Sequence, residues 1–390
     1  MSVTAPQGFS AAGVSSGIKA SGALDLALVC TEDGSPVPAA ATFTTNLAAA
    51  APVRVSRMHL SSTGAMASAV VLSSGNANAA TGERGIDDAK EMCGSVAKLL
   101  GSTPEEVLIC QTGLIGIPLP MEVIRSGIPR LVAERSADEI GGRAAASAIM
   151  TTDTVSKQTH LEVDGWVVGG MAKGAAMLAP NMATMLAVLT TDAGADPGML
   201  GRALRAAVAN SFNKLTVDGS TSTNDTVIVL ANGRSGVAPS EAGLSEILGR
   251  ACDDLALQMA CDAEGATKVV HVIVKGAQSD EEAHRAARRI ADTLLVKCSL
   301  NGEDPYWGRV VSELGSAGVD FEIERVDVSY GGVTVCRGGV AAEHDEAALI
   351  DHMAGSSIEI VCDLDIGNGS SVVLGTDLGH GYIDENRTTS

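Results

Sequence analysis

Aromatic residues are scarce in this chain of 390 residues: they make up 2 % of it, while alanine and glycine are abundant. Many small residues favour layers with close backbone approach, although a GC-rich coding bias would produce the same excess. Hydrophobic residues make up 45 % and charged residues 19 %, which excludes a disordered chain. At this length we expect two sub-domains or two large layers.

Runs of lysine and arginine are also missing, and the formal net charge is −20. A phosphate backbone would be repelled by such a chain unless basic residues were concentrated in one place. The composition therefore argues against nucleic acid as a partner.

No CxxC pair occurs among the eight cysteines, and a chain of this size does not need disulfides for stability. We expect reduced, mostly buried thiols in a cytoplasmic protein. The first twenty residues have no basic region followed by an apolar one, so they do not resemble a signal peptide.

Motifs for metals and nucleotides are absent as well. The seven histidines are scattered, no HExxH is present, and neither GxxxxGK[ST] nor GxGxxG leads from a strand into a helix. We therefore expect no metal and no cofactor. A GxSxG elbow is missing too, but a Ser-His-Asp triad stays open because its members need not be close in sequence.

The pattern of hydrophobic residues predicts grouped strands and helices, which favours a layered α+β fold over a doubly wound parallel sheet. A hairpin with a type I′ turn is expected at Asp164-Gly165, and Pro197 is expected at the first position of a helix. Strands are expected at 24–31, 68–74, 105–111, 184–192, 225–232, 267–276, 325–336 and 358–375, and helices at 86–100, 120–134, 137–150, 197–210, 240–262, 279–297 and 343–353.

The middle of the chain contains an 18-residue run without any charged side chain, Gly174 to Thr191. Such a length raises the question of a membrane span. Pro180, Asn181 and several threonines interrupt the run, so buried strands are the better prediction, with Pro180-Asn181 forming a turn.

Thr184 lies within this run and has two interpretations. It is a β-branched residue of the kind that often opens a strand. Alternatively, cleavage of the peptide bond before it would free an α-amino group, which can act as the base that a threonine hydroxyl needs to become a nucleophile. Ala183 offers little bulk to hinder such a cleavage.

The loop CQTGLIG at 110–116 is a second candidate, because Thr112 and Gly113 can direct a hydroxyl and a backbone N–H at one oxyanion. Turns with Thr-Gly are common, so this signal alone is weak. SGNANAATG (74–82) and VDGSTSTND (217–225) have the composition of turns, or they line a polar pocket.

The segment KGAAMLAPNMATML at 173–186 closely resembles the self-cleavage motif of the glutamate N-acetyltransferase family, also called the ornithine acetyltransferase family. The resemblance covers nearly the whole chain. It also rests on GFSAAGVSSGIKASGALDLALV at the start, TTNLAAAAPV (44–53), SGNANAATGERG, QTGLIG, TTDT (151–154) and DGSTSTND.

The resemblance implies a layered αββα sandwich related to N-terminal-nucleophile proteins. It also implies self-cleavage between Ala183 and Thr184 into an α chain (1–183) and a β chain (184–390), assembled as an α2β2 heterotetramer. Thr184 would carry the acetyl group of N-acetyl-L-ornithine to L-glutamate in a ping-pong reaction. Some members of the family also use acetyl-CoA, and no motif here decides that point.

The resemblance further implies roles for individual residues. Thr112 and Gly113 match the oxyanion hole. The positions that match substrate-binding residues are Thr151 (or Thr152), Lys173, Thr184, Glu264, Asn386 and Ser390 (or Thr388 or Thr389). Two positions depart from the family pattern, Ser220 where an aspartate is usual and Ala80 where a cysteine is common.

Two other functions remain open from the sequence. A related N-terminal-nucleophile amidase or aminopeptidase would hydrolyse its acyl-enzyme instead of transferring the group. An uncleaved chain without catalysis would be a binding protein for basic or acidic amino acids.

Overall fold

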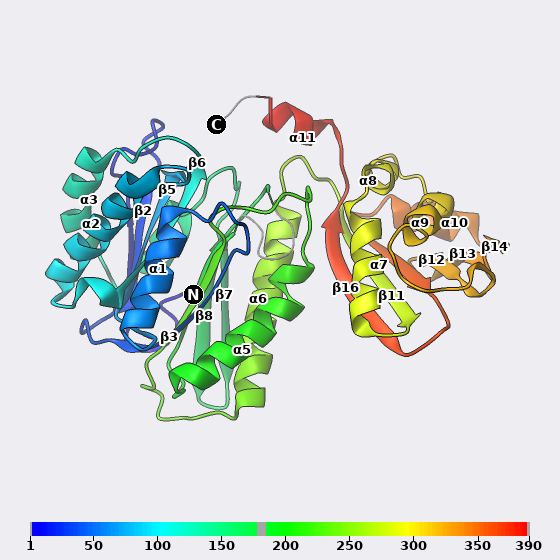
Figure 1. The fold of residues 1–390 in the computed structure, drawn as a ribbon. Coiled ribbons are helices and arrows are strands. Elements are labelled where there is room, and N and C mark those ends of the chain that lie inside the picture. Colours follow the sequence, from blue (N-terminus) through cyan, green and yellow to red (C-terminus); the bar gives the residue numbers. More distant parts are fainter. Residues whose placement is uncertain (1, 178–184, 388–390) are drawn as a thin grey trace. The chain divides into compact units, whose positions relative to one another are not determined.

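Two compact units make up the structure, a computed structural model that describes residues 2–177 and 185–387 (Figure 1). The first unit contains Met1–Asn213 and Ser220–Met259, and the second contains Lys214–Gly219 and Ala260–Thr389. These limits differ from the boundary between residues 183 and 184 that the resemblance implies. Compactness and cleavage are separate properties, so the two cleaved chains remain a prediction.

The first unit contains a four-stranded sheet in the order β1-β2-β5-β6. Its strands are β1 (Phe9–Val14), β2 (Leu26–Thr31), β5 (Ala69–Asn76) and β6 (Val107–Leu114). Helices α1 (Ala51–Ser62), α2 (Gly82–Leu100) and α3 (Met121–Ala133) cover one face of it (Figure 1). Because β5 and β6 run parallel, their carboxyl ends lie at the same edge of the sheet.

A six-stranded sheet faces this one, in the order β4-β3-β10-β9-β8-β7. Its strands are β4 (Met66–Ala67), β3 (Val37–Phe43), β10 (Thr226–Ala231), β9 (Leu186–Thr191), β8 (Trp166–Lys173) and β7 (Lys157–Val163). Apolar residues of both sheets, among them Leu72, Leu108, Val188 and Ile228, form the core between them together with α4 (Glu139–Ala148). Helices α5 (Pro197–Asn210) and α6 (Glu241–Cys261) lie on the outer face, which confirms the expected αββα layers (Figure 1).

The second unit is built on another six-stranded sheet, in the order β14-β13-β12-β15-β11-β16. Its strands are β11 (Val269–Ala277), β12 (Asp327–Tyr330), β13 (Val333–Arg337), β14 (Val340–Ala341), β15 (Ser357–Asp363) and β16 (Gly369–Thr376). Its helices are α7 (Asp280–Asp292), α8 (Leu294–Asn301), α9 (Trp307–Leu314), α10 (Glu346–Met353) and α11 (His380–Glu385). Short 3-10 turns occur at Pro104–Glu106, Phe212–Lys214 and Ile323–Arg325.

Local sequence signals predicted several elements correctly. Asp164 and Gly165 have φ angles of 47° and 87°, as a type I′ turn requires, and they join β7 to β8. Pro197 begins α5, and the Asp196 side chain accepts a hydrogen bond from Met199 N. All six residues of β9 are buried, as expected for the second half of the uncharged run.

One expected helix is wrong. Residues 279–297 do not form a single helix, because Thr293 is extended (φ −77°, ψ 131°) and separates α7 from α8. The change of direction allows Lys297 of α8 to place its Nζ against the Thr376 carbonyl oxygen. This contact is made far along the chain, so the spacing of apolar residues in 279–297 did not indicate it.

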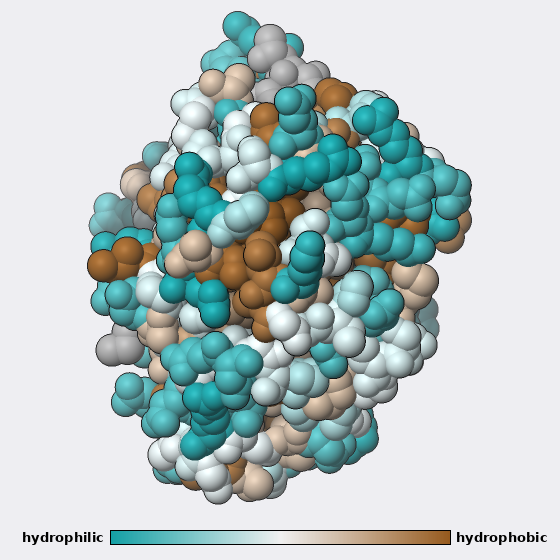
Figure 2. All heavy atoms as spheres, turned by 90° about the vertical axis from the view of Figure 1, so that its left-hand side faces the viewer, coloured by the Kyte–Doolittle hydropathy of each residue, from teal (hydrophilic) through white to brown (hydrophobic). Residues whose placement is uncertain are grey.

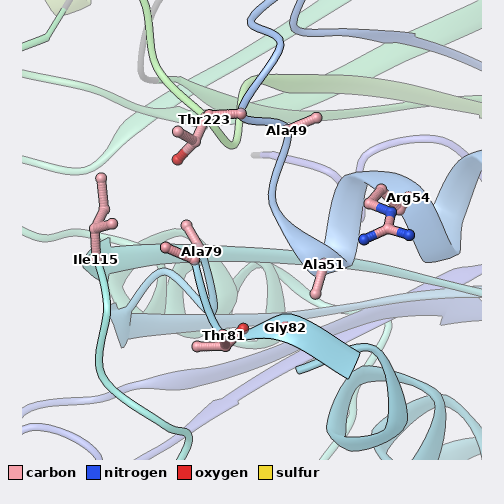
Figure 3. Close-up of a pocket in the computed structure, with 10 residues that line it drawn as sticks. Ala49, Ala51, Arg54, Ala79, Thr81, Gly82, Ile115 and Thr223 are labelled. Atoms are coloured by element: carbon pink, nitrogen blue, oxygen red, sulfur yellow. The ribbon is translucent and has the colours of Figure 1, made fainter. Parts of the chain in front are cut away.

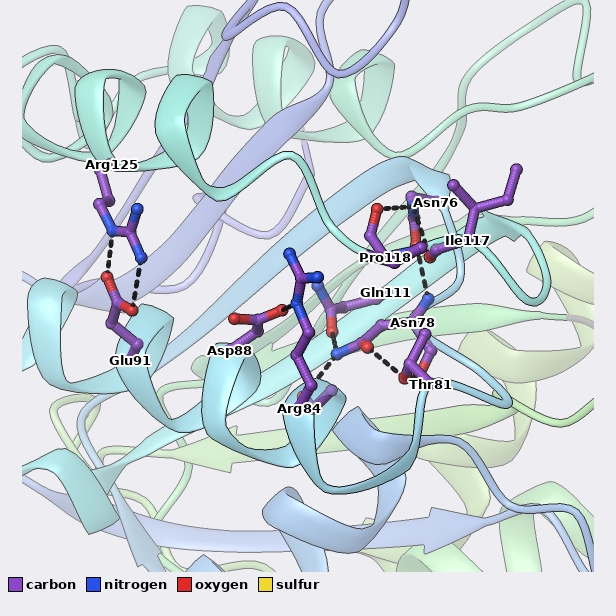
Figure 4. Close-up of polar contacts among 11 residues, drawn as sticks. Asn76, Asn78, Thr81, Arg84, Asp88, Glu91, Gln111, Ile117, Pro118 and Arg125 are labelled. Carbon is purple, nitrogen blue, oxygen red and sulfur yellow. Dashed lines mark hydrogen bonds and ion pairs between the residues drawn. The ribbon is translucent and has the colours of Figure 1, made fainter.

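Helices α2 and α3 present a mixed surface. Figure 2 looks onto this side of the molecule and shows apolar surface surrounded by hydrophilic side chains. Arg125 of α3 pairs with Glu91 of α2, with 2.9 Å between Arg125 Nη2 and Glu91 Oε2 (Figure 4). Exposed pairs of this kind contribute at most about 1 kcal/mol. The buried apolar face of each helix is therefore the main source of its stability.

All eight cysteines are free thiols, and six of them are buried, while Cys261 and Cys298 are exposed. The thiols are therefore mostly buried, as expected. Within the described ranges, no helix is both long and apolar enough to cross a lipid bilayer.

Candidate active site

Thr112 lies near the carboxyl end of β6, where only 2 % of its surface is exposed. Lys173, at the end of β8, points its Nζ at Thr112 Oγ1 over 3.4 Å. An ammonium can only donate, so the Thr112 oxygen accepts in this contact. The Thr112 hydroxyl proton therefore points elsewhere, as a donor to an oxyanion must.

Gly113 has a φ of 129°, a conformation that L side chains rarely adopt. A Cβ atom at this position would lie 2.3 Å from the carbonyl carbon of Gly75 in the neighbouring strand. Both the backbone angle and the close approach of β5 therefore require glycine. This is a physical reason for the Thr-Gly pair that the sequence alone did not provide.

The side-chain amides of Asn76, Asn78 and Gln111 form a network of hydrogen bonds next to the end of β6 (Figure 4). Gln111 Oε1 accepts a hydrogen bond from Asn78 Nδ2 at 2.9 Å, and Asn76 Oδ1 accepts one from Asn78 N at 2.8 Å. Asn76 Nδ2 in turn donates to the carbonyl oxygens of Ile117 and Pro118. Much of the segment 74–82 thus supports the loop that carries Thr112 and Gly113.

Asp153 is a buried carboxylate that accepts several hydrogen bonds and lies near two lysines, and the sequence analysis did not name it as a site residue. Its Oδ1 accepts from Lys157 Nζ at 2.5 Å and from Gly174 N at 2.8 Å, and its Oδ2 accepts from Thr151 N at 2.9 Å. Burial would raise the pKa of Asp153, but the ammonium groups of Lys173 and Lys157 outweigh burial and lower this pKa to about 2. The carboxylate links Thr151 to Lys173, two of the expected substrate-binding residues.

Asp153→Ala is expected to lower the free energy of unfolding by about 3–5 kcal/mol, because it removes the carboxylate from a buried lysine. The Asp153 and Lys157 side chains are both 0 % exposed. Urea denaturation at neutral pH measures the change. The control is Asp196→Ala, which removes a helix cap and should cost only about 1 kcal/mol. Equal losses in the two variants would contradict the role of Asp153.

The contribution of the Asp153 carboxylate to the free energy of unfolding should also depend on pH. Its pKa is lowered from the ordinary value of 3.8 to about 2, so its contribution is complete above pH ~4 and is lost as the pH falls through 2. We expect the wild type to lose about 2 kcal/mol more than Asp153→Ala between these two pH values.

Residues 17–25 contact the chain next to Thr151. Asp25 Oδ2 accepts from the backbone N–H groups of Gly17, Ile18 and Lys19, at 3.0, 2.7 and 3.1 Å. Lys19 Nζ then donates to the carbonyl oxygen of Met150 at 2.7 Å. This bond holds the chain directly before Thr151, a role that the sequence did not indicate.

Glu264 and Asn386 meet in the second unit. Asn386 Nδ2 donates to Glu264 Oε2 at 2.7 Å, and Glu264 is buried with 7 % exposure. The structure thus brings together two expected substrate-binding residues that are 122 positions apart. Thr184, Ala183, Pro180, Asn181 and Ser390, with Thr388 and Thr389, lie outside the described residues.

A cavity of about 250 Å³ lies in the first unit (Figure 3). It adjoins the loop after Gly113 through Ile115, and it adjoins the TSTND segment through Thr223. The other lining residues are Ala48, Ala49, Ala51, Arg54, Ala79, Ala80, Thr81 and Gly82. Both Gly/Asn/Ser/Thr-rich segments therefore line a pocket, but this pocket is mainly apolar and has one cation.

Potential metal ligands do not gather in the parts of the chain that the structure describes: no three His, Cys, Asp or Glu side chains there could hold one ion together.

The chain resembles known proteins over its full length. The family model described as the ArgJ family matches residues 10–388. The "Arginine biosynthesis bifunctional protein ArgJ" of Mycobacterium bovis is 49 % identical, with 100 % of this chain and 96 % of that protein covered. The protein of the same name from Streptomyces avermitilis is 47 % identical, with 100 % of both chains covered.

The chain is also similar to a solved structure. A structure of ornithine acetyltransferase from Mycobacterium tuberculosis, in complex with ornithine, is 49 % identical with a TM-score of 0.44. It covers 46 % of this chain and 94 % of that one. The family match and the full-length relatives at 47–49 % identity show that this chain belongs to the ArgJ family.

Proposed function

We propose that this protein is a glutamate N-acetyltransferase of arginine biosynthesis, which transfers the acetyl group of N-acetyl-L-ornithine to L-glutamate. The observation that carries the proposal is the contact between Lys173 and Thr112 beside Gly113, at positions that the family resemblance marks, in a chain with full-length ArgJ relatives. The hydrolase alternative has no comparable support.

Thr184 is the nucleophile in this proposal, freed by cleavage after Ala183. Its Oγ bonds to the acetyl carbonyl carbon, and its proton passes to its own α-amino group, whose ordinary pKa of about 7.7–8.0 suits a base near neutral pH. The carbonyl oxygen becomes an oxyanion, which the Thr112 hydroxyl and the Gly113 N–H stabilise as donors.

Collapse of this intermediate breaks the C–N bond. The ornithine amino group takes the proton and leaves, and an acetyl ester remains on Thr184. The amino group of glutamate then attacks the ester through a second oxyanion, and N-acetyl-L-glutamate leaves as Thr184 Oγ regains its proton. Splitting the transfer in this way replaces one difficult step with two easier ones.

Substrate recognition needs groups for an α-carboxylate that both amino acids share. Lys173 is suited to it, because this residue is only 2 % exposed and its ammonium lies 3.4 Å from the Thr112 hydroxyl. Asp153 and Thr151 order the adjacent chain. The family resemblance adds Glu264, Asn386 and Ser390 as substrate-binding residues of the proposal, with the Glu264 carboxylate suited to an amino group and bonded by Asn386 Nδ2. A cytoplasmic location and an α2β2 assembly are part of the proposal.

The test is intact-protein mass spectrometry before and after a brief incubation with N-acetyl-L-ornithine and no acceptor. We expect two fragments that meet at Ala183/Thr184, with one acetyl group on the Thr184 fragment, and loss of this label when glutamate is added. Loss of the label without formation of N-acetyl-L-glutamate would favour the hydrolase. A single unlabelled chain would overturn the proposal. A parallel incubation with acetyl-CoA tests the second donor.

A further inference from the structure

Asp225 lies directly before β10 and is completely buried. Its Oδ1 accepts a hydrogen bond from Met185 N at 2.9 Å. That nitrogen belongs to the peptide bond that joins Met185 to Thr184. The Met185 carbonyl oxygen also accepts from Thr226 N at 3.2 Å, so both polar groups of the Met185 backbone are held by this short segment.

Asn224, the preceding residue, holds the opposite sheet. Its Nδ2 donates to the carbonyl oxygens of Ala77 at 2.6 Å and Gln111 at 2.9 Å. Gln111 precedes Thr112 in β6, and Ala77 follows the end of β5. One side-chain amide therefore links the two strand ends that flank Thr112 and Gly113.

Consecutive Cα atoms are separated by a fixed 3.8 Å, so these two anchors cannot move independently. We propose that Asn224 and Asp225 are positioning residues that fix Met185, the residue after the proposed nucleophile, relative to the loop of Thr112 and Gly113. The inference rests on the proposed function. It extends that function because two consecutive residues, one bonded to each sheet, would fix the distance between the nucleophile and the oxyanion hole.

The state of the Asp225 carboxyl supports a positioning role. Burial raises the pKa of Asp225 well above its ordinary value, against the opposing effect of hydrogen bonds from Met185 N and from Ser222. Asparagine has the shape of aspartate and keeps a side-chain oxygen that can accept from Met185 N, so Asp225→Asn should preserve this hydrogen bond.

Asp192 supplies a matched control, because it directly follows β9, the strand that begins after Met185. It is also buried, and it accepts backbone hydrogen bonds from Val167 N at 2.8 Å and Gln7 N at 3.2 Å. Asp192→Ala should therefore destabilise the chain in a similar way without moving Thr184. Comparison of the two alanine variants separates positioning from general stability.

The experiment follows cleavage and the rate of Thr184 acetylation by mass spectrometry, with kcat, KM and thermal midpoint for each variant. Asp225→Ala should slow cleavage or acetylation on the order of 10- to 100-fold, with kcat affected more than KM, because a misplaced nucleophile loses its attack geometry. Asp225→Asn should restore the rate to within about threefold, and Asp192→Ala should retain it.

Equal rates in Asp225→Ala and Asp192→Ala would overturn the inference, and so would a failure of Asp225→Asn to restore the rate in a folded protein. If Asp225→Ala does not fold, Asn224→Ala supplies the same comparison, since it removes both bonds to the strand ends around Thr112. A normal rate of acetylation in folded Asn224→Ala would then contradict the positioning role of Asn224 and Asp225. Absence of acetylation in the wild type would instead defeat the proposed function.

Discussion

Thr184→Ala is expected to accumulate as one uncleaved chain without acetyl transfer activity. The substitution removes the hydroxyl that attacks the Ala183 carbonyl, and an uncleaved chain never frees the α-amino group that serves as the base. Intact mass and the rate of N-acetyl-L-glutamate formation measure both effects. We expect the largest loss of any single substitution, down to the background of the assay.

Thr184→Ser is the matched variant, because serine keeps a hydroxyl and, once cleaved, an α-amino group. It should cleave and accept one acetyl group, at a reduced rate. Efficient cleavage of Thr184→Ala at residue 183 would show that another group cuts the chain. Acetylation of Thr184→Ala would show that the nucleophile lies elsewhere.

Thr112→Val should slow acetyl transfer by about 10²–10³-fold, the range that follows the loss of one oxyanion-hole donor. Valine keeps the branched shape of threonine but has no hydroxyl proton for the oxyanion. Lys173 loses its contact with the Thr112 oxygen as well. Steady-state kinetics should therefore show the loss in kcat, together with a smaller change in KM.

Thr190→Val is the control for this variant. Thr190 is also fully buried, and its hydroxyl donates to the Val3 carbonyl oxygen at 2.7 Å. Its removal should cost on the order of 1 kcal/mol of stability and leave turnover unchanged. If Thr112→Val turned over as fast as Thr190→Val, the oxyanion donors would have to be sought outside the loop at 110–116.

Local signals in the sequence predicted much of the first unit. The alternation of apolar residues around Asp164-Gly165 defines a hairpin, and Asp196-Pro197 defines the start of α5. The uncharged run correctly indicated the buried strand β9. Several elements were missed, among them β3 and α1, which pack mainly against the distant strands β10 and β6. The sequence analysis did not predict β1 and α9 either.

For the site, the sequence identified residues through the family resemblance and not through their environment. Thr112 and Lys173 were named, and the structure places them in contact. Asp153, Asn224 and Asp225 were not named as site residues, since an aspartate or asparagine in a polar segment has the composition of a turn. Their importance lies in what they contact, which no spacing rule reveals.

The sequence by itself indicated the family, because long, unusual motifs carry the resemblance, and local periodicity indicated a layered α+β fold. The αββα layers and the reacting residues followed from the resemblance, and the roles of these residues stay a prediction. Only the tertiary structure decided how distant segments meet: that Asp153 accepts a hydrogen bond from Gly174 N, that Gly113 lies against Gly75, and that Asn224 and Asp225 contact different sheets. The physical reason is that burial and hydrogen bonding act between residues that are neighbours in space. A buried carboxylate obtains its charge state and its role from partners that the fold supplies.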